Sequence, residues 1–380
     1  MRTAYFDNAS TTPVDKRVID KMQSCLSPDG TFGNPASTTH SFGWMASEEV
    51  EWARETVADC IGAGPREIVW TSGATESDNL AIRGSVQAMR VSTGRTKIIT
   101  MESEHKAVID TCSHLDDVDV VILKPEPSGL VCMDALAKVL DEDTLLVSIM
   151  LVNNETGVVQ PIQTIARLAH DVGAFVHSDL AQAVGKLQWT VDQLGIDLGS
   201  LSAHKVHGPK GIGALYVRRG RCQVAEQQHG GKHERGMRSG TLPSHQIVGM
   251  AEAYRLSKKE AYSEIQRLDR IRDQIEETLG DLGGVQINGK RGVPHILNFT
   301  VDGVDGERLM AAMPQIAVST GSACNAATIE PSHVLQAMGL SRRQGLSSIR
   351  VSTGRMTTED DVTMLLDSLR YAISQLRSSA

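Results

Sequence analysis

Residues 145–177 read LLVSIMLVNNETGVVQPIQTIARLAHDVGAFVH, and this stretch indicates the fold class. Two apolar runs, Leu145–Val152 and Ala174–His177, enclose a segment, Pro161–Asp171, in which apolar residues recur with helical spacing. Unbroken apolar runs are typical of strands that are buried on both faces of a sheet, and a helix between two such strands allows them to run parallel. The stretch therefore predicts a β–α–β unit of an α/β protein.

The same alternation extends over residues 65–218. Helix-period segments such as Glu76–Met89 and Met133–Leu140 separate further apolar runs of strand length. We therefore expect a mostly parallel, seven-stranded sheet with helices on both faces. The other five expected strands are Ile68–Trp70, Ile98–Met101, Val118–Leu123, Leu198–Ser202 and Ile212–Val217.

The pattern changes near residue 257. A long, charged amphipathic helix is expected over Lys258–Leu279, fewer strands follow, and a second helix is expected over Thr358–Arg377. We predict a large domain of residues 16–256, and a smaller α+β domain that combines residues 1–15 with residues 257–380.

Composition narrows the classes of protein. The 380 residues include 38 Lys and Arg against 46 Asp and Glu, a net charge of −8, so we do not expect direct nucleic-acid binding as the main activity. No apolar run approaches the length of a membrane span, and the first residues lack the apolar region of a signal peptide, so a cytoplasmic location is expected. None of the six cysteines forms a C-x-x-C pair, and no metal site is predicted.

In open α/β sheets, ligands bind beyond the carboxyl ends of the strands. Thr71–Glu76 follow the first expected strand and begin a helix; they include Ala74 and Thr75. Small and hydroxyl residues at a helix N-terminus form a seat for an anion, because free N–H groups and the helix dipole point toward it. A simple helix cap at Ser72 or Thr75 is the alternative.

Polar residues follow three further strands. His105 comes after the second strand and Asn154 after Leu145–Val152. Ser178 and Asp179 follow Ala174–His177, and Gln182 lies one helical step further on. A buried carboxylate is costly unless it is paired, which favours a ligand for Asp179. The alternatives are a structural role for His105, an Asn/Gly turn at Asn154 and a helix N-cap at Asp179.

Lys205 follows the strand Leu198–Ser202 after Ala203 and His204. A desolvated lysine near another cation loses its proton readily and can attack a carbonyl. The alternative is that Lys205 is a surface lysine, and Lys210 is the rival candidate for the reactive amine. An anion seat, a flat imidazole, a carboxylate and this amine together form the set that pyridoxal 5′-phosphate requires.

Two residues of the second half of the chain extend this set. Cys324 lies in a stretch rich in small residues, 319–327, and is a candidate for an accessible, reactive thiol. Arg350 lies in an expected short strand among small residues, where its guanidinium suits a substrate carboxylate. The alternatives are that Cys324 has no functional role and that Arg350 forms a surface ion pair.

Over nearly its whole length, the chain resembles the NifS/IscS-type cysteine desulfurases, which are fold-type I, pyridoxal-phosphate-dependent transferases of aminotransferase class V. The motifs are long and specific. They are YFDNASTTP at 5–13, GNPAS at 33–37, TSGATESDN at 71–79, EHKA at 104–107, VNNE at 152–155, SAHK at 202–205, RSGT at 238–241 and GSAC at 321–324.

The resemblance implies a homodimer and a role for each residue. Lys205 would bind the cofactor aldehyde, His105 would stack on the ring and assist acid–base steps, and Asp179 would pair with the ring nitrogen. Gln182 would bond the ring hydroxyl, and Cys324 would accept the sulfur. Phosphate contacts would come from Ala74, Thr75, Ser202 and His204, with Thr241 from the other subunit, and carboxylate contacts from Asn34, Asn154 and Arg350.

The implied reaction removes sulfur from L-cysteine, gives L-alanine, and leaves a persulfide on Cys324 for an acceptor protein. That acceptor would be an iron–sulfur scaffold or an enzyme of nucleic-acid thio-modification. The C-terminal docking segment of the housekeeping members is missing from this sequence, which leaves a specialised role open. A selenocysteine lyase, an aminotransferase and a sulfur-relay subunit that depends on a partner are the alternatives.

Overall fold

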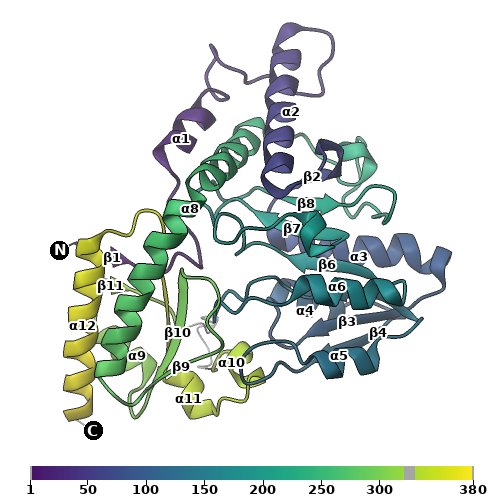
Figure 1. The fold of residues 1–380 in the computed structure, drawn as a ribbon. Coiled ribbons are helices and arrows are strands. Elements are labelled where there is room, and N and C mark those ends of the chain that lie inside the picture. Colours follow the sequence, from purple (N-terminus) through teal and green to yellow (C-terminus); the bar gives the residue numbers. More distant parts are fainter. Residues whose placement is uncertain (1, 321–329, 379–380) are drawn as a thin grey trace.

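A computed structural model describes residues 2–320 and 330–378, and its largest element is a seven-stranded sheet in the order β2-β8-β7-β6-β5-β3-β4 (Figure 1). All neighbours pair in parallel except β8, which is antiparallel to both β2 and β7. The strands are β2 (Ile68–Thr71), β3 (Lys97–Met101), β4 (Asp119–Leu123), β5 (Thr144–Ser148), β6 (Phe175–Asp179), β7 (Leu198–Ser202) and β8 (Gly213–Val217).

Helices cover both faces of this sheet. Consecutive residues of β5 enter different apolar clusters: Val147 packs with α2, α5, α6 and α8, whereas Leu146 packs with α3 and α4. The expected mostly parallel α/β sheet is therefore confirmed. The helices are α1 (Lys16–Gln23), α2 (Ser41–Ile61), α3 (Ala74–Thr93), α4 (Lys106–Ser113), α5 (Met133–Val139), α6 (Ile162–Asp171), α7 (Val191–Leu194) and α8 (Ser244–Asp281), with 3-10 turns at Pro65–Glu67 and Glu234–Gly236.

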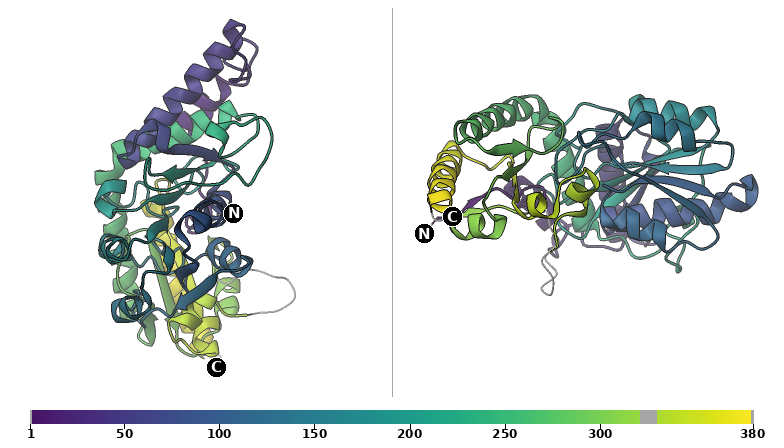
Figure 2. Two further views of the ribbon diagram at one scale, coloured as in Figure 1. Left: turned by 90° about the vertical axis from the view of Figure 1, so that its right-hand side faces the viewer. Right: turned by 90° about the horizontal axis from the view of Figure 1, so that it is seen from below.

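A smaller α+β unit lies at one end of the large sheet (Figure 2). It holds an antiparallel sheet in the order β12-β10-β9, and the parallel pair β1–β11. Helices α8 and α12 of this unit pack against each other through apolar residues that include Leu268, Ile275, Leu365 and Leu369. The elements are β1 (Ala4–Tyr5), β9 (Val285–Ile287), β10 (Ile296–Val301), β11 (Ile316–Ala317), β12 (Ser348–Ser352), α9 (Gly306–Ala311), α10 (His333–Ala337), α11 (Arg342–Leu346) and α12 (Glu359–Ser378).

One helix passes through both units. We expected it to begin at Lys258, but α8 begins at Ser244, so that expectation is wrong. Residues such as Ile247, Met250 and Tyr254 are fully buried, so this half of the helix lacks the alternation of charged and apolar residues that marks the other half. Leu256 packs in the core of the large sheet, and Leu268 packs in the core of the small unit.

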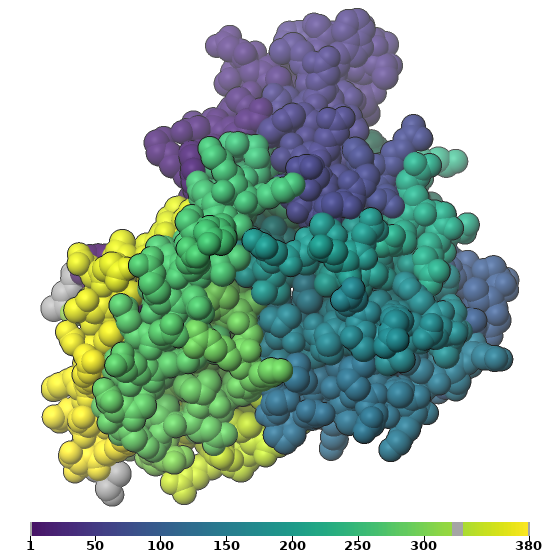
Figure 3. Space-filling view, viewed as in Figure 1, coloured from purple at the N-terminus to yellow at the C-terminus, as the bar shows by residue number. Residues whose placement is uncertain are grey.

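The space-filling view shows α1 and the start of α2 projecting from the body of the molecule (Figure 3). Within residues 2–320 and 330–378, no helix has the length and apolar character needed to cross a membrane.

Candidate active site

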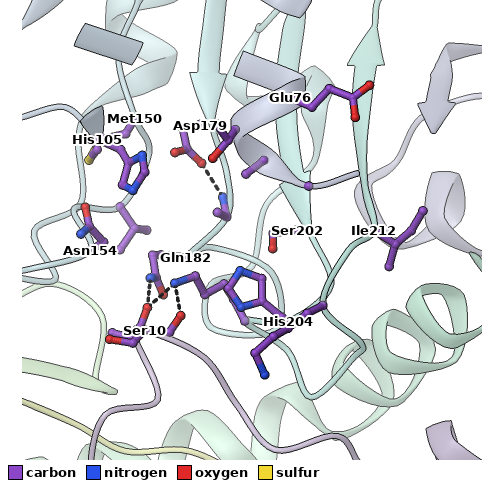
Figure 4. Close-up of a pocket in the computed structure, with 18 of the residues that line it drawn as sticks. Ser10, Glu76, His105, Met150, Asn154, Asp179, Gln182, Ser202, His204 and Ile212 are labelled. Carbon is purple, nitrogen blue, oxygen red and sulfur yellow. Dashed lines mark hydrogen bonds between the residues drawn. The ribbon is translucent and has the colours of Figure 1, made fainter. Parts of the chain in front are cut away.

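A cavity of about 580 Å³ lies beyond the carboxyl ends of β2, β3, β5, β6 and β7 (Figure 4). This is the edge where ligands bind in open α/β sheets. Ten of the predicted residues line it: Ala74, Thr75, His105, Asn154, Asp179, Gln182, Ser202, His204, Lys205 and Arg350.

Two predicted residues do not line this cavity. Asn34 and Thr241 are exposed and do not line it. The side chain of Asn34 accepts a hydrogen bond from the amide of Ala36 (2.9 Å), as in a local turn. Cys324 lies outside the residues that the structure describes.

The predicted anion seat lies at the start of α3. Gly73 is the N-cap, and no side chain caps the first turn, so the helix cap that was the alternative at Ser72 or Thr75 is not formed. A Cβ at Gly213 would lie 2.7 Å from the Cα of Gly73 and would also contact the carbonyl of Leu201. Glycine at this position therefore lets β8 approach the helix start closely.

Ser202 completes the seat at the end of β7. Its hydroxyl is buried and has no hydrogen-bond partner within the described residues. The phenol of Tyr254 donates to the carbonyl of Ser202 (3.2 Å) and fixes the backbone there. Because buried polar groups are normally paired, this hydroxyl is suited to a bound phosphate.

Asp179 ends β6 with its carboxylate facing the cavity. Its Oδ1 accepts the amide of Ala181 (2.8 Å). Burial raises the pKa of Asp179, and the Ala181 amide, His105 and Lys205 offset this in part. A cationic N–H within the cavity would stabilise the ionised carboxylate, as the ring nitrogen of pyridoxal phosphate requires.

Lys205 holds its amine inside the cavity, whereas Lys210 is exposed. The Lys205 amine donates to the carbonyls of Ala9 (2.5 Å) and Ser10 (2.6 Å). Burial, followed by the positive charge of Arg350, lowers the pKa of Lys205 to about 8. Lys205 is therefore not the surface lysine of the alternative interpretation, and it has the environment of a nucleophilic amine.

Two histidines also line the cavity. His105 caps α4, and its Nδ1 accepts the amide of Ala107 (3.1 Å), so the neutral ring carries its proton on Nε2. His204 pairs through Nδ1 with the hydroxyl of Thr11 (3.1 Å), and burial together with Lys205 lowers the pKa of His204 to about 4. His204 is therefore neutral at pH 7.

Arg350 projects from β12 of the small unit into the same cavity. One of its terminal nitrogens donates to the carbonyl of Asn154 (2.9 Å). The other donates to Asp7 (2.7 Å) and to the hydroxyl of Ser10 (2.8 Å). The predicted arginine is thus held in a buried network and not in a surface ion pair.

Residues that sequence reasoning did not single out also form the site. The segment 7–11 supplies the carbonyls that hold Lys205, and the Gln182 amide donates to the Ala9 carbonyl (2.8 Å). The segment lies within the first matched motif, which was the only signal for it. Both oxygens of Asp78 are buried and make no hydrogen bond of normal geometry to any described residue, and burial and the charge of Asp179 raise the pKa of Asp78 well above the usual range. The described residues include no cluster of His, Cys, Asp or Glu that could hold a metal ion.

Comparisons with known proteins show the family to which the chain belongs. Residues 4–365 match the family Aminotransferase class-V. The proteins named cysteine desulfurase IscS from Edwardsiella ictaluri and Pectobacterium atrosepticum are each 51% identical over 378 residues, which cover 98% of this chain and 93% of theirs.

Solved structures give the same result. A NifS-like protein superposes with a TM-score of 0.90 at 35% identity, covering 98% of this chain and 100% of its own. DndA from Streptomyces lividans superposes with a TM-score of 0.77 at 37% identity, over 90% of this chain and 97% of its own.

Proposed function

Because the chain belongs to the class-V aminotransferase family and is a pyridoxal-phosphate-dependent cysteine desulfurase, we propose that it takes the sulfur of L-cysteine as a persulfide on Cys324, releases L-alanine and passes the sulfur to an acceptor protein. One observation carries the proposal. A buried amine, a buried carboxylate, an anion seat and an arginine face one cavity, as the cofactor and an amino-acid substrate together require.

The residues present fit the cofactor. Ala74, Thr75, Ser202 and His204 would hold its phosphate, and Asp179, His105, Gln182 and Lys205 would hold its ring nitrogen, ring face, hydroxyl and aldehyde. When bound, pyridoxal phosphate supplies an electron sink that stabilises negative charge at the substrate Cα.

The residues of the chain supply the remaining steps. Arg350 and Asn154 bind the α-carboxylate and fix the orientation of the substrate. Lys205, whose pKa is lowered to about 8, takes the proton from Cα. The thiolate of Cys324 attacks the substrate sulfur, a sulfur–sulfur bond forms, the carbon–sulfur bond breaks, and the carbon skeleton leaves as alanine after protonation.

We propose that the working form is a cytoplasmic homodimer. Thr241 is exposed and lies outside the cavity of its own chain, which is consistent with a role at the phosphate seat of a second copy. The acceptor would be an iron–sulfur scaffold or an enzyme that adds sulfur to nucleic acid.

The decisive experiment supplies the holoenzyme with L-cysteine and a reductant and measures alanine and sulfide. The wild type should form both in equal amounts, and Cys324→Ser should bind the cofactor but release no sulfide. Cys132→Ser, which removes a different thiol that is partly accessible, is the matched control and should behave as wild type. A wild type that forms no alanine contradicts the proposed function, and full sulfide release by Cys324→Ser contradicts the role of that thiol.

A further inference from the structure

The guanidinium of Arg350 is held on one side and open on the other. Its two terminal nitrogens donate to Asn154, Asp7 and Ser10, as described above. Its third nitrogen, Nε, is buried and has no hydrogen-bond partner within the described residues. A buried donor without a partner in a ligand cavity indicates the position of an acceptor on the ligand.

Asp7 is the carboxylate that contacts this guanidinium. The Asp7–Arg350 distance is 2.7 Å, and the exposed fractions of the two side chains are 23% and 6%. Other contacts on Arg350 come from neutral groups, a carbonyl and a hydroxyl. A charge-assisted bond is about twice as strong as a neutral one, so Asp7 makes the strongest contact with Arg350.

The backbone of Asp7 is itself fixed. Asp7 pairs with Ser352 at the end of β12, and the hydroxyl of Tyr5 donates to the carbonyls of Asp7 (3.0 Å) and Thr11 (2.9 Å). Asp7 is therefore anchored to the same strand that carries Arg350, and its carboxylate approaches the guanidinium from a defined direction.

We propose that Asp7 is a positioning residue for substrate recognition: by accepting a hydrogen bond from a terminal nitrogen of Arg350, it turns the guanidinium so that Nε faces the α-carboxylate of the substrate. This inference rests on the proposed function, in which Arg350 binds that carboxylate. The N–H of Nε points in one direction within the guanidinium plane, and a hydrogen bond weakens steeply when its angle is poor, so a rotation of the guanidinium would weaken the bond to the carboxylate.

Two variants separate the contact from the charge. Asn at position 7 keeps an oxygen acceptor and removes the negative charge, whereas Ala removes both. The probe is L-alanine, which carries the carboxylate and amine of the substrate but no thiol. Its dissociation constant is read from the change in absorption of the holoenzyme cofactor.

We expect Asp7→Ala to weaken L-alanine binding roughly ten-fold, and Asp7→Asn to weaken it by less than about three-fold. Asp15→Ala is the control for lost stability. Asp15 forms ion pairs with Arg17 (2.7 Å) and with Arg355 (3.0 Å), and it does not line the cavity. That variant should lower the melting temperature and leave the L-alanine dissociation constant unchanged.

The inference is overturned if Asp7→Ala binds L-alanine as tightly as wild type, or more tightly, since the charge of Asp7 would then only compete with the substrate. It is also overturned if Asp7→Asn and Asp7→Ala lose affinity equally. Turnover of L-cysteine by the wild type is measured in parallel, because its absence would contradict the proposed function and not the role of Asp7.

Discussion

Lys205 shows how the surroundings of a single residue set its reactivity. With a pKa of about 8, roughly 10% of the amine is neutral at pH 7, compared with about 0.03% for an exposed lysine. We therefore predict that the cofactor-free protein binds pyridoxal phosphate at a rate that rises with pH and levels off above about pH 8. Stopped-flow absorption measures this rate.

Lys210 supplies the control for this prediction. Its side chain is exposed at the edge of the same cavity. We expect Lys210→Ala to keep the cofactor through dialysis with the same pH profile, and Lys205→Ala to lose it. A rate that rises up to pH 10 would show that Lys205 has the pKa of an ordinary lysine.

Glu155 is a second residue whose pKa lies near neutral pH. Its side chain is buried, it accepts a hydrogen bond from the hydroxyl of Ser332, and burial raises its pKa to about 7. The unfolded chain ionises near pH 4.3, so between about pH 4.5 and 7 only the unfolded state releases this proton. The stability of the protein therefore falls as pH rises through this window, by at most about 4 kcal/mol.

We predict that Glu155→Gln removes this loss. Urea unfolding at pH 5.5 and pH 8 should show a smaller difference in the variant than in the wild type. Glu55→Gln changes an exposed glutamate and should leave the difference unchanged. An equal pH dependence in wild type and Glu155→Gln would refute this assignment.

At the scale of elements, β8 approaches the start of α3 closely, at the place of the proposed anion seat. A Cβ at Gly213 would meet backbone atoms of Leu201 and Gly73, which cannot rotate away. We predict that Gly213→Ala lowers the melting temperature and weakens cofactor binding at least ten-fold, because the seat must widen. Equilibrium dialysis of the cofactor and differential scanning calorimetry test this.

Gly280 provides the matched substitution. It lies in α8, and a Cβ there would meet open space. Gly280→Ala should stabilise the helix by about 0.5–1 kcal/mol and leave cofactor affinity unchanged. Equal affinity in Gly213→Ala and wild type would mean that the seat does not depend on this approach.

The sequence predicts elements with strong periodicity and predicts contacts between distant elements poorly. All seven strands of the large sheet were expected, because each is an apolar run between turn residues. The run Leu145–Val152 is the exception in length, since β5 already ends at Ser148. The burial of Asp78 could not be predicted, and neither could the hydrogen bonds from Lys205 to the carbonyls of Ala9 and Ser10, because periodicity does not show which distant segments are in contact.

The resemblance contributed what periodicity could not. Residue patterns placed His105, Asp179 and Lys205 at strand ends, where the structure brings them together. The motif YFDNASTTP was matched without a role for Asp7, because a single sequence gives no reason to pair Asp7 with Arg350.

At the scale of the whole molecule, Thr241 tests the homodimer. We predict that light scattering gives twice the chain mass of 41.0 kDa, and that Thr241→Ala weakens cofactor binding although this residue is exposed and outside its own cavity. Thr363→Ala, an exposed threonine on α12, should have no effect. A monomer in solution, or unchanged affinity in Thr241→Ala, would contradict the proposed assembly.

The pair between Asp7 and Arg350 joins residues that are 343 positions apart. The ribosome therefore synthesises β12 long after it has synthesised the segment that carries Asp7. Until that strand emerges, Asp7 has no guanidinium to hold, and the substrate pocket stays unfinished. Nascent chains that are halted before β12 should thus fail to bind an amino acid, which makes this pocket a late event in folding.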